Sequence, residues 1–232
     1  MSLRLVAVRF DAHDPEALGA FWAGVLGREI IEEANGRLLP GNDTQLGLRF
    51  VAATTEKSGR NRLHLHLTSS TTEDQRRTVE TVLRLGGSRF GTKPLPMGRD
   101  DIFLADPGGN EFCVIEPGNN YLAGCGRLGE FTCDGTREVG LFWRDALGWP
   151  LVWDQGKQIA IQSPRGGTKI SWDSWPAAPE NGRNRQQFDL AAPEPAAEAE
   201  RLGALGATVL GDRDGGVELA DPDGDLFSVI RS

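Results

Sequence analysis

Cysteine is scarce in this chain of 232 residues, and long apolar runs are absent. The three cysteines, Cys113, Cys125 and Cys133, are an odd number without a CxxC spacing, which argues against a disulfide framework and suits a reducing compartment. No segment approaches the roughly 20 apolar residues that span a bilayer, and the first residues lack the apolar run of an export signal. We therefore predict a cytoplasmic protein without a membrane partner.

Positive charge is also in deficit. Lysine and arginine number 25 against 33 acidic residues, for a formal net charge of −8, and no block of like charge stands out. Nucleic acids and anionic membranes attract cationic surfaces, so this balance argues against both as main partners. The proportions of charged and apolar residues are those of a globular protein with a packed core.

An internal repeat is the strongest signal that is present. Three segments of the first half recur in the same order, at nearly constant spacing, in the second half. The matched pairs are residues 21–27 with 142–148, 61–67 with 184–190, and 105–115 with 220–230. Between the two halves, residues 116–124 contain a proline, two glycines and paired asparagines, which favours a turn or linker. We predict domains at 1–117 and 126–232, joined by a linker at 118–125.

Each half divides again into two similar units. Residues 5–10 alternate as a strand, and Asp14 followed by Pro15 is typical of a helix start. An apolar stripe then runs to Gly27, which can take the left-handed conformation that ends a helix. Further helices are predicted near 72–85, 136–147 and 195–205, each followed by short strands. The unit is therefore one strand, one helix and three strands, used four times.

Such paired units, closed by an Asp-Pro-x-Gly turn at 106–109 and at 221–224, resemble the vicinal oxygen chelate superfamily. That group includes glyoxalase I, extradiol dioxygenases, fosfomycin-modifying enzymes and bleomycin-resistance proteins. The resemblance implies an α+β fold of two glyoxalase-like domains. Each would be made of paired βαβββ units that form a cupped mixed β-sheet with helices on the outside.

The resemblance leaves three functions open, because its motifs specify a fold more than a reaction. The first is a protein that binds a small organic molecule in a sheet cleft without a complete metal triad. The second is a divalent-metal-dependent lyase, isomerase or dioxygenase that uses His64. In the third, the second domain has a structural role, because it contains no histidine. It would then support the first domain or form a dimer interface. A monomer or a homodimer is expected.

Strand alternation selects the candidate site residues. Leu63, Leu65 and Leu67 should face the helices, which leaves His64 and His66 facing a cleft. We predict that His64, His66 and Arg9 share one cleft, and that Glu130 and Asp189 share the other. The predicted ligand-binding residues are Arg9, His66, Glu111, Cys113, Glu130, Gln187, Asp189, Ser228, Trp172 and Trp175.

The resemblance also implies positions for metal ligands. His64 is the one strong ligand among them, and Cys113 could add a thiolate, a pair that suits zinc better than iron or magnesium. A divalent metal at His64 is therefore a hypothesis with an incomplete ligand set. As an alternative, a neutral His64 imidazole could act as a catalytic general base. The matching positions are Ala7, His64 and Cys113 in the first half, and Leu128, Gln187 and Ser228 in the second.

Overall fold

The computed structural model describes residues 3–54, 57, 59–90, 101–173, 184–213 and 215–232. The βαβββ unit predicted from the sequence occurs four times along the chain, as expected. The elements are β1 (Arg4–Ala12), α1 (Pro15–Leu26), β2 (Ile31–Glu33), β3 (Gly36–Leu39), β4 (Gly47–Ala52), β5 (Leu63–Leu67), α2 (Thr72–Arg84), β6 (Ser88–Arg89), β7 (Ile102–Ala105), β8 (Glu111–Val114), β9 (Leu128–Cys133), α3 (Arg137–Leu147), β10 (Leu151–Gln155), β11 (Gln158–Gln162), β12 (Lys169–Trp172), β13 (Gln186–Ala192), α4 (Pro195–Leu205), β14 (Thr208–Arg213), β15 (Gly216–Ala220) and β16 (Leu226–Arg231).

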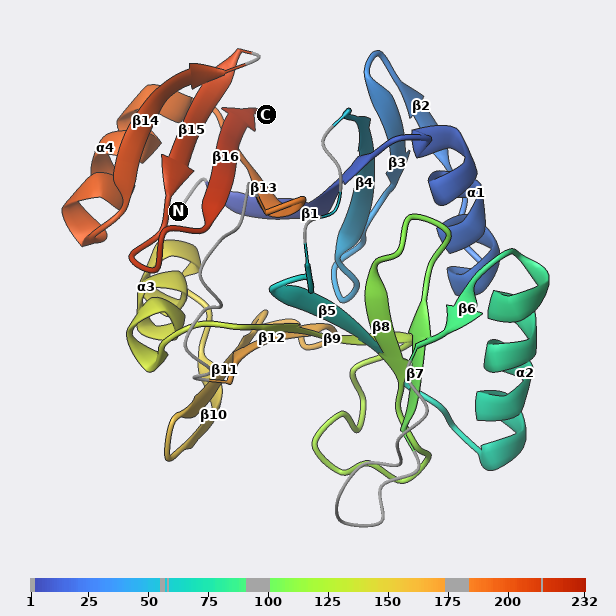
Figure 1. Ribbon diagram of the computed structural model, residues 1–232. Coiled ribbons are helices and arrows are strands. Elements are labelled where there is room, and N and C mark those ends of the chain that lie inside the picture. The colour runs from blue at the N-terminus through green and yellow to red at the C-terminus, as the bar shows by residue number, and fades with distance from the viewer. Residues whose placement is uncertain (1–2, 55–56, 58, 91–100, 174–183, 214) are drawn as a thin grey trace.

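The strands form two eight-stranded mixed sheets. Sheet A has the order β14-β15-β16-β13-β1-β4-β3-β2, and sheet B has the order β10-β11-β12-β9-β5-β8-β7-β6. The centre of sheet A is the antiparallel pair β1 and β13, and the centre of sheet B is the antiparallel pair β5 and β9. Figure 1 shows α1 and α2 on one side of the molecule and α3 and α4 on the opposite side.

Each sheet combines one unit from each half of the chain. The first unit pairs with the fourth, and the second pairs with the third, whereas the sequence analysis grouped the first unit with the second in one cleft. The reason is physical: all four units offer the same kind of apolar first strand, so the hydrophobic pattern does not distinguish their partners. The predicted division of the chain into domains at 1–117 and 126–232, with a linker at 118–125, describes the sequence repeat and stays a prediction.

Two tryptophans tie the helices to the closing turns. Trp22 of α1 and Trp143 of α3 are buried, as predicted. The indole Nε1 of Trp22 donates to Asp106 Oδ2 at 3.0 Å, and that of Trp143 donates to Asp221 Oδ2 at 3.1 Å. The Asp-Pro turns are thus more than chain reversals, because their buried carboxylates hold the first helix of each half in place.

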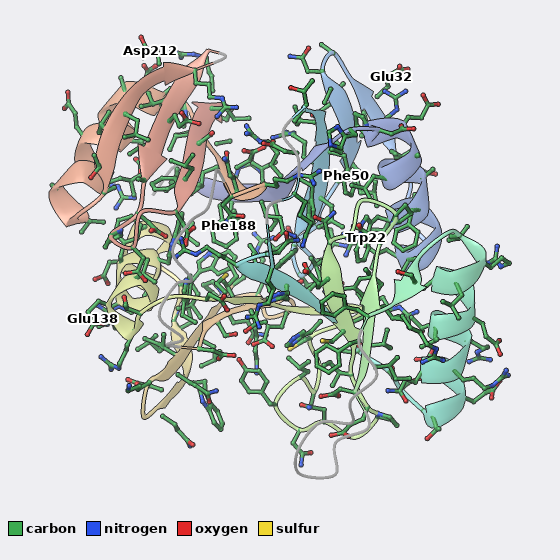
Figure 2. All side chains as sticks on the ribbon, in the orientation of Figure 1. Trp22, Glu32, Phe50, Glu138, Phe188 and Asp212 are labelled. Carbon is green, nitrogen blue, oxygen red and sulfur yellow. The ribbon has the colours of Figure 1, made fainter. Side chains whose placement is uncertain are left out.

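The core lies between the sheets and around the helices. Trp22 packs against Phe112 of sheet B at 4.9 Å between ring centroids, and Trp143 packs against Phe188 of sheet A at 5.0 Å. Figure 2 shows Phe50 and Phe188 in the interior, while Glu32 and Asp212 extend from the periphery. None of the helices in the described ranges is long and apolar enough to cross a membrane.

Helix α1 begins and ends as the sequence predicts. The Asp14 side chain accepts a hydrogen bond from the backbone N–H of Ala17 at 2.9 Å, and Pro15 occupies the first turn. Gly27 ends the helix with a φ of 64°. This left-handed conformation is unfavourable for any residue that has a Cβ atom, so glycine is preferred there. These capping residues fix where α1 begins and ends relative to the strands that it covers.

Replacing Trp22 by phenylalanine tests the link between helix and turn. Trp22→Phe removes one donor from the buried Asp106 carboxylate, whose pKa burial already raises. We expect the free energy of unfolding to fall by about 1–3 kcal/mol, measured by urea denaturation. Trp153→Phe, on a partly exposed indole of β10, is the matched control and should change stability by less than about 0.5 kcal/mol. Equal stabilities of the two variants would contradict the role given to the indole N–H.

Candidate ligand-binding site

A cavity of about 250 Å³ opens on the concave face of sheet B. Strands from both halves of the chain build it, together with the turn that follows β8. Its walls combine apolar, aromatic and ionisable side chains. The lining residues are His66, Ile115, Asn119, Tyr121, Leu122, Glu130, Thr132, Trp153, Gln158, Ile159, Ser171 and Asp173.

Strand alternation places the polar side chains of the cavity. In β5 the three leucines are buried in the core, so His64 and His66 point to the opposite face, as predicted. Across the antiparallel pairing, His66 lies opposite Glu130 and His64 lies opposite Thr132. The pairing of β5 with β9 therefore brings together two charged side chains that are far apart in the sequence.

His66, Glu130 and Tyr121 form a hydrogen-bonded group in the cavity. His66 Nδ1 lies 2.9 Å from Glu130 Oε2, and the Tyr121 hydroxyl donates to Glu130 Oε1 at 2.7 Å. Burial lowers the pKa of His66, but hydrogen bonds with Cys113 and Glu130 outweigh it and raise the pKa to about 10. Burial opposes the ionised form of Glu130, yet its bonds with His66 and Tyr121 hold its pKa below the usual range. At neutral pH the pair is an imidazolium and a carboxylate.

A second hydrogen-bonded chain ends at Asp173. The Ser171 hydroxyl donates to Thr132 Oγ1 at 3.1 Å, and the Thr132 hydroxyl donates to Asp173 Oδ2 at 3.2 Å. Burial, together with the charge of Glu130, raises the pKa of Asp173. Burial and the same charge also raise the pKa of Tyr121, so its phenol stays neutral at neutral pH.

One side of the cavity is aromatic. The rings of Tyr121 and Trp153 meet edge to face, with centroids 5.4 Å apart and planes at 77°. Lys169 lies over the Tyr121 ring, with Nζ 4.1 Å from the centroid, and Nζ also donates to the Tyr121 carbonyl oxygen. This arrangement holds the two rings at a fixed angle beside the polar groups.

His64, the predicted catalytic residue, is on the same face of β5 but does not line this cavity. Burial lowers the pKa of His64 to about 3, and the charges of Arg60, His66 and Lys57 add to the shift. Its imidazole is therefore neutral at pH 7, and so low a pKa makes it a weak proton acceptor. Glu111, also predicted to bind ligand, instead pairs with Lys57 Nζ at 2.8 Å.

The concave face of sheet A holds a different polar group. Arg9 on β1 lies between Gln187 of β13 on one side and Arg49 of β4 on the other. On β13, Asp189 lies beside Ser228 of β16. Arg49 bonds to Asp189 and also to Glu33, whose Oε2 is 2.8 Å from Arg49 Nε. Asp189, which the sequence analysis predicted to bind ligand, therefore already has a guanidinium as its partner.

These contacts correct the predicted grouping of the clefts. Arg9 does not share a face with His64 and His66, and Glu130 does not share one with Asp189. His66 and Glu130 face one another in sheet B, while Arg9 and Asp189 belong to sheet A. The error follows from the assumption that each half of the chain forms its own sheet.

Several buried polar atoms of sheet A lack a hydrogen-bond partner within the described residues. They are Arg9 Nε and Nη2, Gln186 Nε2 and Oε1, Gln187 Oε1 and Ser228 Oγ. Arg9 Nη2 is 3.3 Å from Asp11 Oδ1, close enough for an ion pair but without hydrogen-bond geometry. Proteins satisfy most buried polar atoms, so these groups mark a second polar face with unused hydrogen-bonding capacity.

The predicted aromatic ligand contacts are also revised. Trp172 is buried on the opposite side of β12, where its ring packs against Gly140 of α3. Trp172 therefore does not line the sheet B cavity, so its role in ligand binding stays a prediction, and Trp175 lies outside the described residues. The sequence analysis missed Tyr121, Ser171 and Asp173 as cavity residues. Alternation along β12 carried a signal for Ser171, because a buried Trp172 puts its neighbour on the concave face.

The residues present do not fit a divalent metal ion. In the described part of the chain, no group of three or more His, Cys, Asp and Glu side chains is arranged to hold one. In sheet B, His66 carries a proton and its Nδ1 is bound to Glu130, so it offers no free lone pair there. In sheet A, the guanidinium groups of Arg9 and Arg49 occupy the face that donor atoms would need. The predicted metal positions are also divided, with His64, Cys113 and Leu128 in sheet B and the others in sheet A.

The His66 pair gives stability a pH dependence with a defined sign. The pKa of His66 is about 10 in the folded protein against an ordinary 6.5, so the folded state holds the proton more tightly. Its stabilising contribution is complete below pH 6.5 and is lost as the pH rises through 10. We expect His66→Gln to lower the free energy of unfolding by about 1.5–3 kcal/mol at pH 7, a difference that shrinks toward pH 10. Urea denaturation between pH 6 and 10 measures it.

His64→Gln is the matched control, because the pKa of His64 shifts the other way. Folding lowers it from 6.5 to about 3, so the unfolded chain holds that proton more tightly and stability is lost as the pH falls from 6.5 toward 3. Relative to the unmodified protein, His64→Gln should therefore change how the free energy of unfolding depends on pH below 6.5 and leave its pH dependence above 6.5 unaltered. Parallel profiles for His66→Gln and the unmodified protein above pH 6.5 would contradict the assigned imidazolium.

Comparisons with known proteins agree with this architecture. The crystal structure of glyoxalase I from Zea mays is similar with a TM-score of 0.70 and 13% sequence identity, over 99% of this chain and 92% of that one. A putative dioxygenase from Bacillus subtilis is similar with a TM-score of 0.62 and 13% identity, over 98% of this chain and 84% of that one. At these identities the likeness shows the fold alone. The sequences of curated proteins include no match.

The sequence itself matches a family description over most of its length. The glyoxalase-like domain family matches twice, at residues 7–115 and at residues 130–230. The two matches cover both halves of the repeat, and the four βαβββ units with their two cupped sheets are the fold that the resemblance implied. The chain therefore belongs to the glyoxalase-like domain family, as a member with two domains in tandem.

Proposed function

We propose that this protein binds a small organic molecule in the cavity of sheet B. The observation that carries the proposal is a cavity of about 250 Å³ with an aromatic wall on one side and fixed hydrogen-bonding groups at its base. Small-molecule sites are typically concave, largely apolar and fitted with a few well-placed polar groups. The volume lies just below the usual range, which favours a ligand of one ring or a comparable chain.

The polar groups are suited to recognition because their partners hold them in place. Glu130 accepts from both His66 and Tyr121, and Asp173 accepts from Thr132. A ligand that enters therefore meets side chains that have already lost their rotational freedom, which reduces the entropic cost of binding. This ordering supports a binding role whether or not a reaction follows.

The alternative of a metal-dependent enzyme has less support. It requires His64 either to hold a divalent ion or to accept a proton, and His64 does not line the cavity. The pKa of about 3 for His64 also places it far from the neutral range in which a general base is most effective. We therefore propose binding as the activity of the sheet B site.

A fragment screen tests the proposal. Single-ring compounds would be screened against the protein by ligand-observed NMR, and the dissociation constants of the hits measured by titration. We expect Trp153→Leu, which removes one aromatic wall, to weaken binding of the hits about tenfold or more, corresponding to about 1.4 kcal/mol.

Ser228→Ala provides the control. Ser228 is on the last strand of the fourth unit and corresponds to Ser171 on the last strand of the third unit, but it lies in sheet A, away from the cavity of sheet B. It should leave the affinities unchanged, and thermal unfolding checks that both variants fold. Hits that bind Trp153→Leu as tightly as the unmodified protein would place the ligand elsewhere and overturn the proposed site.

A further inference from the structure

The ionisable groups of the sheet B cavity do not balance in charge. Three of its lining residues carry an imidazole or a carboxyl group: His66, Glu130 and Asp173. His66 and Glu130 form a pair of opposite charges whose atoms are 2.9 Å apart, so each largely offsets the other. Asp173 is a further acid, and the described lining residues offer it no positive charge that is not already paired.

The nearby cations are committed to other groups. Lys169 lies over the Tyr121 ring and donates to the Tyr121 carbonyl oxygen. Arg60 pairs with Asp134, at 2.9 Å between Nη2 and Oδ1. Within the ranges that the structure describes, no ion pair joins Asp173 to a lysine or arginine. Among the described residues, the Thr132 hydroxyl donates to Oδ2 of this carboxylate, which lines the cavity where a ligand would meet it.

The electrostatic surroundings of Asp173 add to the imbalance. Burial and the charges of Glu130 and Asp134 act against its ionised form, while the hydrogen bond from Thr132 and the charge of His66 favour it. A half-buried carboxylate in such surroundings gains most from a positively charged partner that enters from outside the protein. An anionic ligand would instead add a further negative charge beside Asp173 and Glu130.

The aromatic wall favours the same class of ligand. Tyr121 and Trp153 line the cavity together with Asp173 and meet edge to face. Because Lys169 already lies over the Tyr121 ring, the indole of Trp153 is the ring that a cationic ligand would contact. Cations are attracted to the faces of such rings, most strongly to that of tryptophan. The apolar side chains of Ile115 and Leu122 complete a space that suits a hydrocarbon body.

We propose that the ligand of this cavity is a small organic cation, a protonated amine on an apolar or aromatic body, whose ammonium group pairs with Asp173 beside the Trp153 and Tyr121 rings. The inference rests on the proposed function and assigns its ligand class. It also gives separate roles to the two acids, since Glu130 holds His66 and Tyr121 in place while Asp173 contacts the ligand.

Three probes that share one ring and one chain length test the charge of the ligand. Phenethylamine is cationic at pH 7, phenethyl alcohol is neutral and phenylacetate is anionic. Titration calorimetry or NMR titration with the full chain should show the amine binding about tenfold more tightly than the alcohol, the effect of one charge-assisted hydrogen bond. Phenylacetate should bind most weakly.

Asp173→Asn keeps the shape of the side chain and removes its charge. We expect it to bring the affinities for amine and alcohol to within about twofold of each other, mainly by weakening the amine. Asp173→Glu should restore part of the preference. Asp134→Asn is the control, because Asp134 is another half-buried acid on the neighbouring strand end, but it is paired with Arg60 and does not line the cavity. It should leave the preference for the amine intact, and thermal unfolding monitors folding of all three.

Equal or tighter binding of phenylacetate would overturn the inference, as would an Asp173→Asn variant that still prefers the amine. Failure of phenethylamine to bind, while hits of the fragment screen still depend on Trp153, would also overturn the ligand class but leave the cavity as a binding site. If no hit depends on Trp153, the proposed function itself is wrong. The two failures are thus distinguishable.

Discussion

The antiparallel pairing of β5 with β9 is the contact on which the sheet B site depends. It sets His66 opposite Glu130, although the two residues belong to different halves of the chain. The charge pair of the cavity follows from that register. A shift of one residue would turn the histidines toward the core and the leucines toward the cavity, because side chains alternate between the two faces of a strand.

The buried imidazolium and carboxylate illustrate how a polar cavity is made tolerable. Burial alone disfavours both charges, and an isolated one would be costly. Here Glu130 receives two hydrogen bonds, from His66 and from the Tyr121 hydroxyl, so both carboxylate oxygens are satisfied. The pair therefore contributes order to the site, whereas Asp173, which receives the Thr132 hydroxyl among the described residues, is the acid that we propose to contact the ligand.

Local chemistry explains which parts could be predicted from the sequence. The alternation of leucine and histidine in β5 and the start of α1 at Asp14 are encoded by neighbouring residues, and both were predicted correctly. The partners of the strands are set by contacts between distant units with similar apolar faces, so the pairing of β5 with β9 was not predictable from pattern. Tyr121 was missed for a related reason: it lies in a connecting turn, where no periodicity indicates the direction of a side chain.

The two sheets show how one fold supports different sites. In sheet A, Arg49 joins Asp189 and Glu33 across the concave face, while in sheet B a neutralised pair leaves one carboxylate available. The joining of units from opposite halves has a further consequence. In a chain containing only one half, the inner edges of its first strands would lack these partners, and two such chains could cover those edges by pairing about a two-fold axis. The tandem chain is the covalent counterpart of that dimer. Because its halves are no longer identical, a substitution on the concave face of one sheet need not be repeated on that of the other.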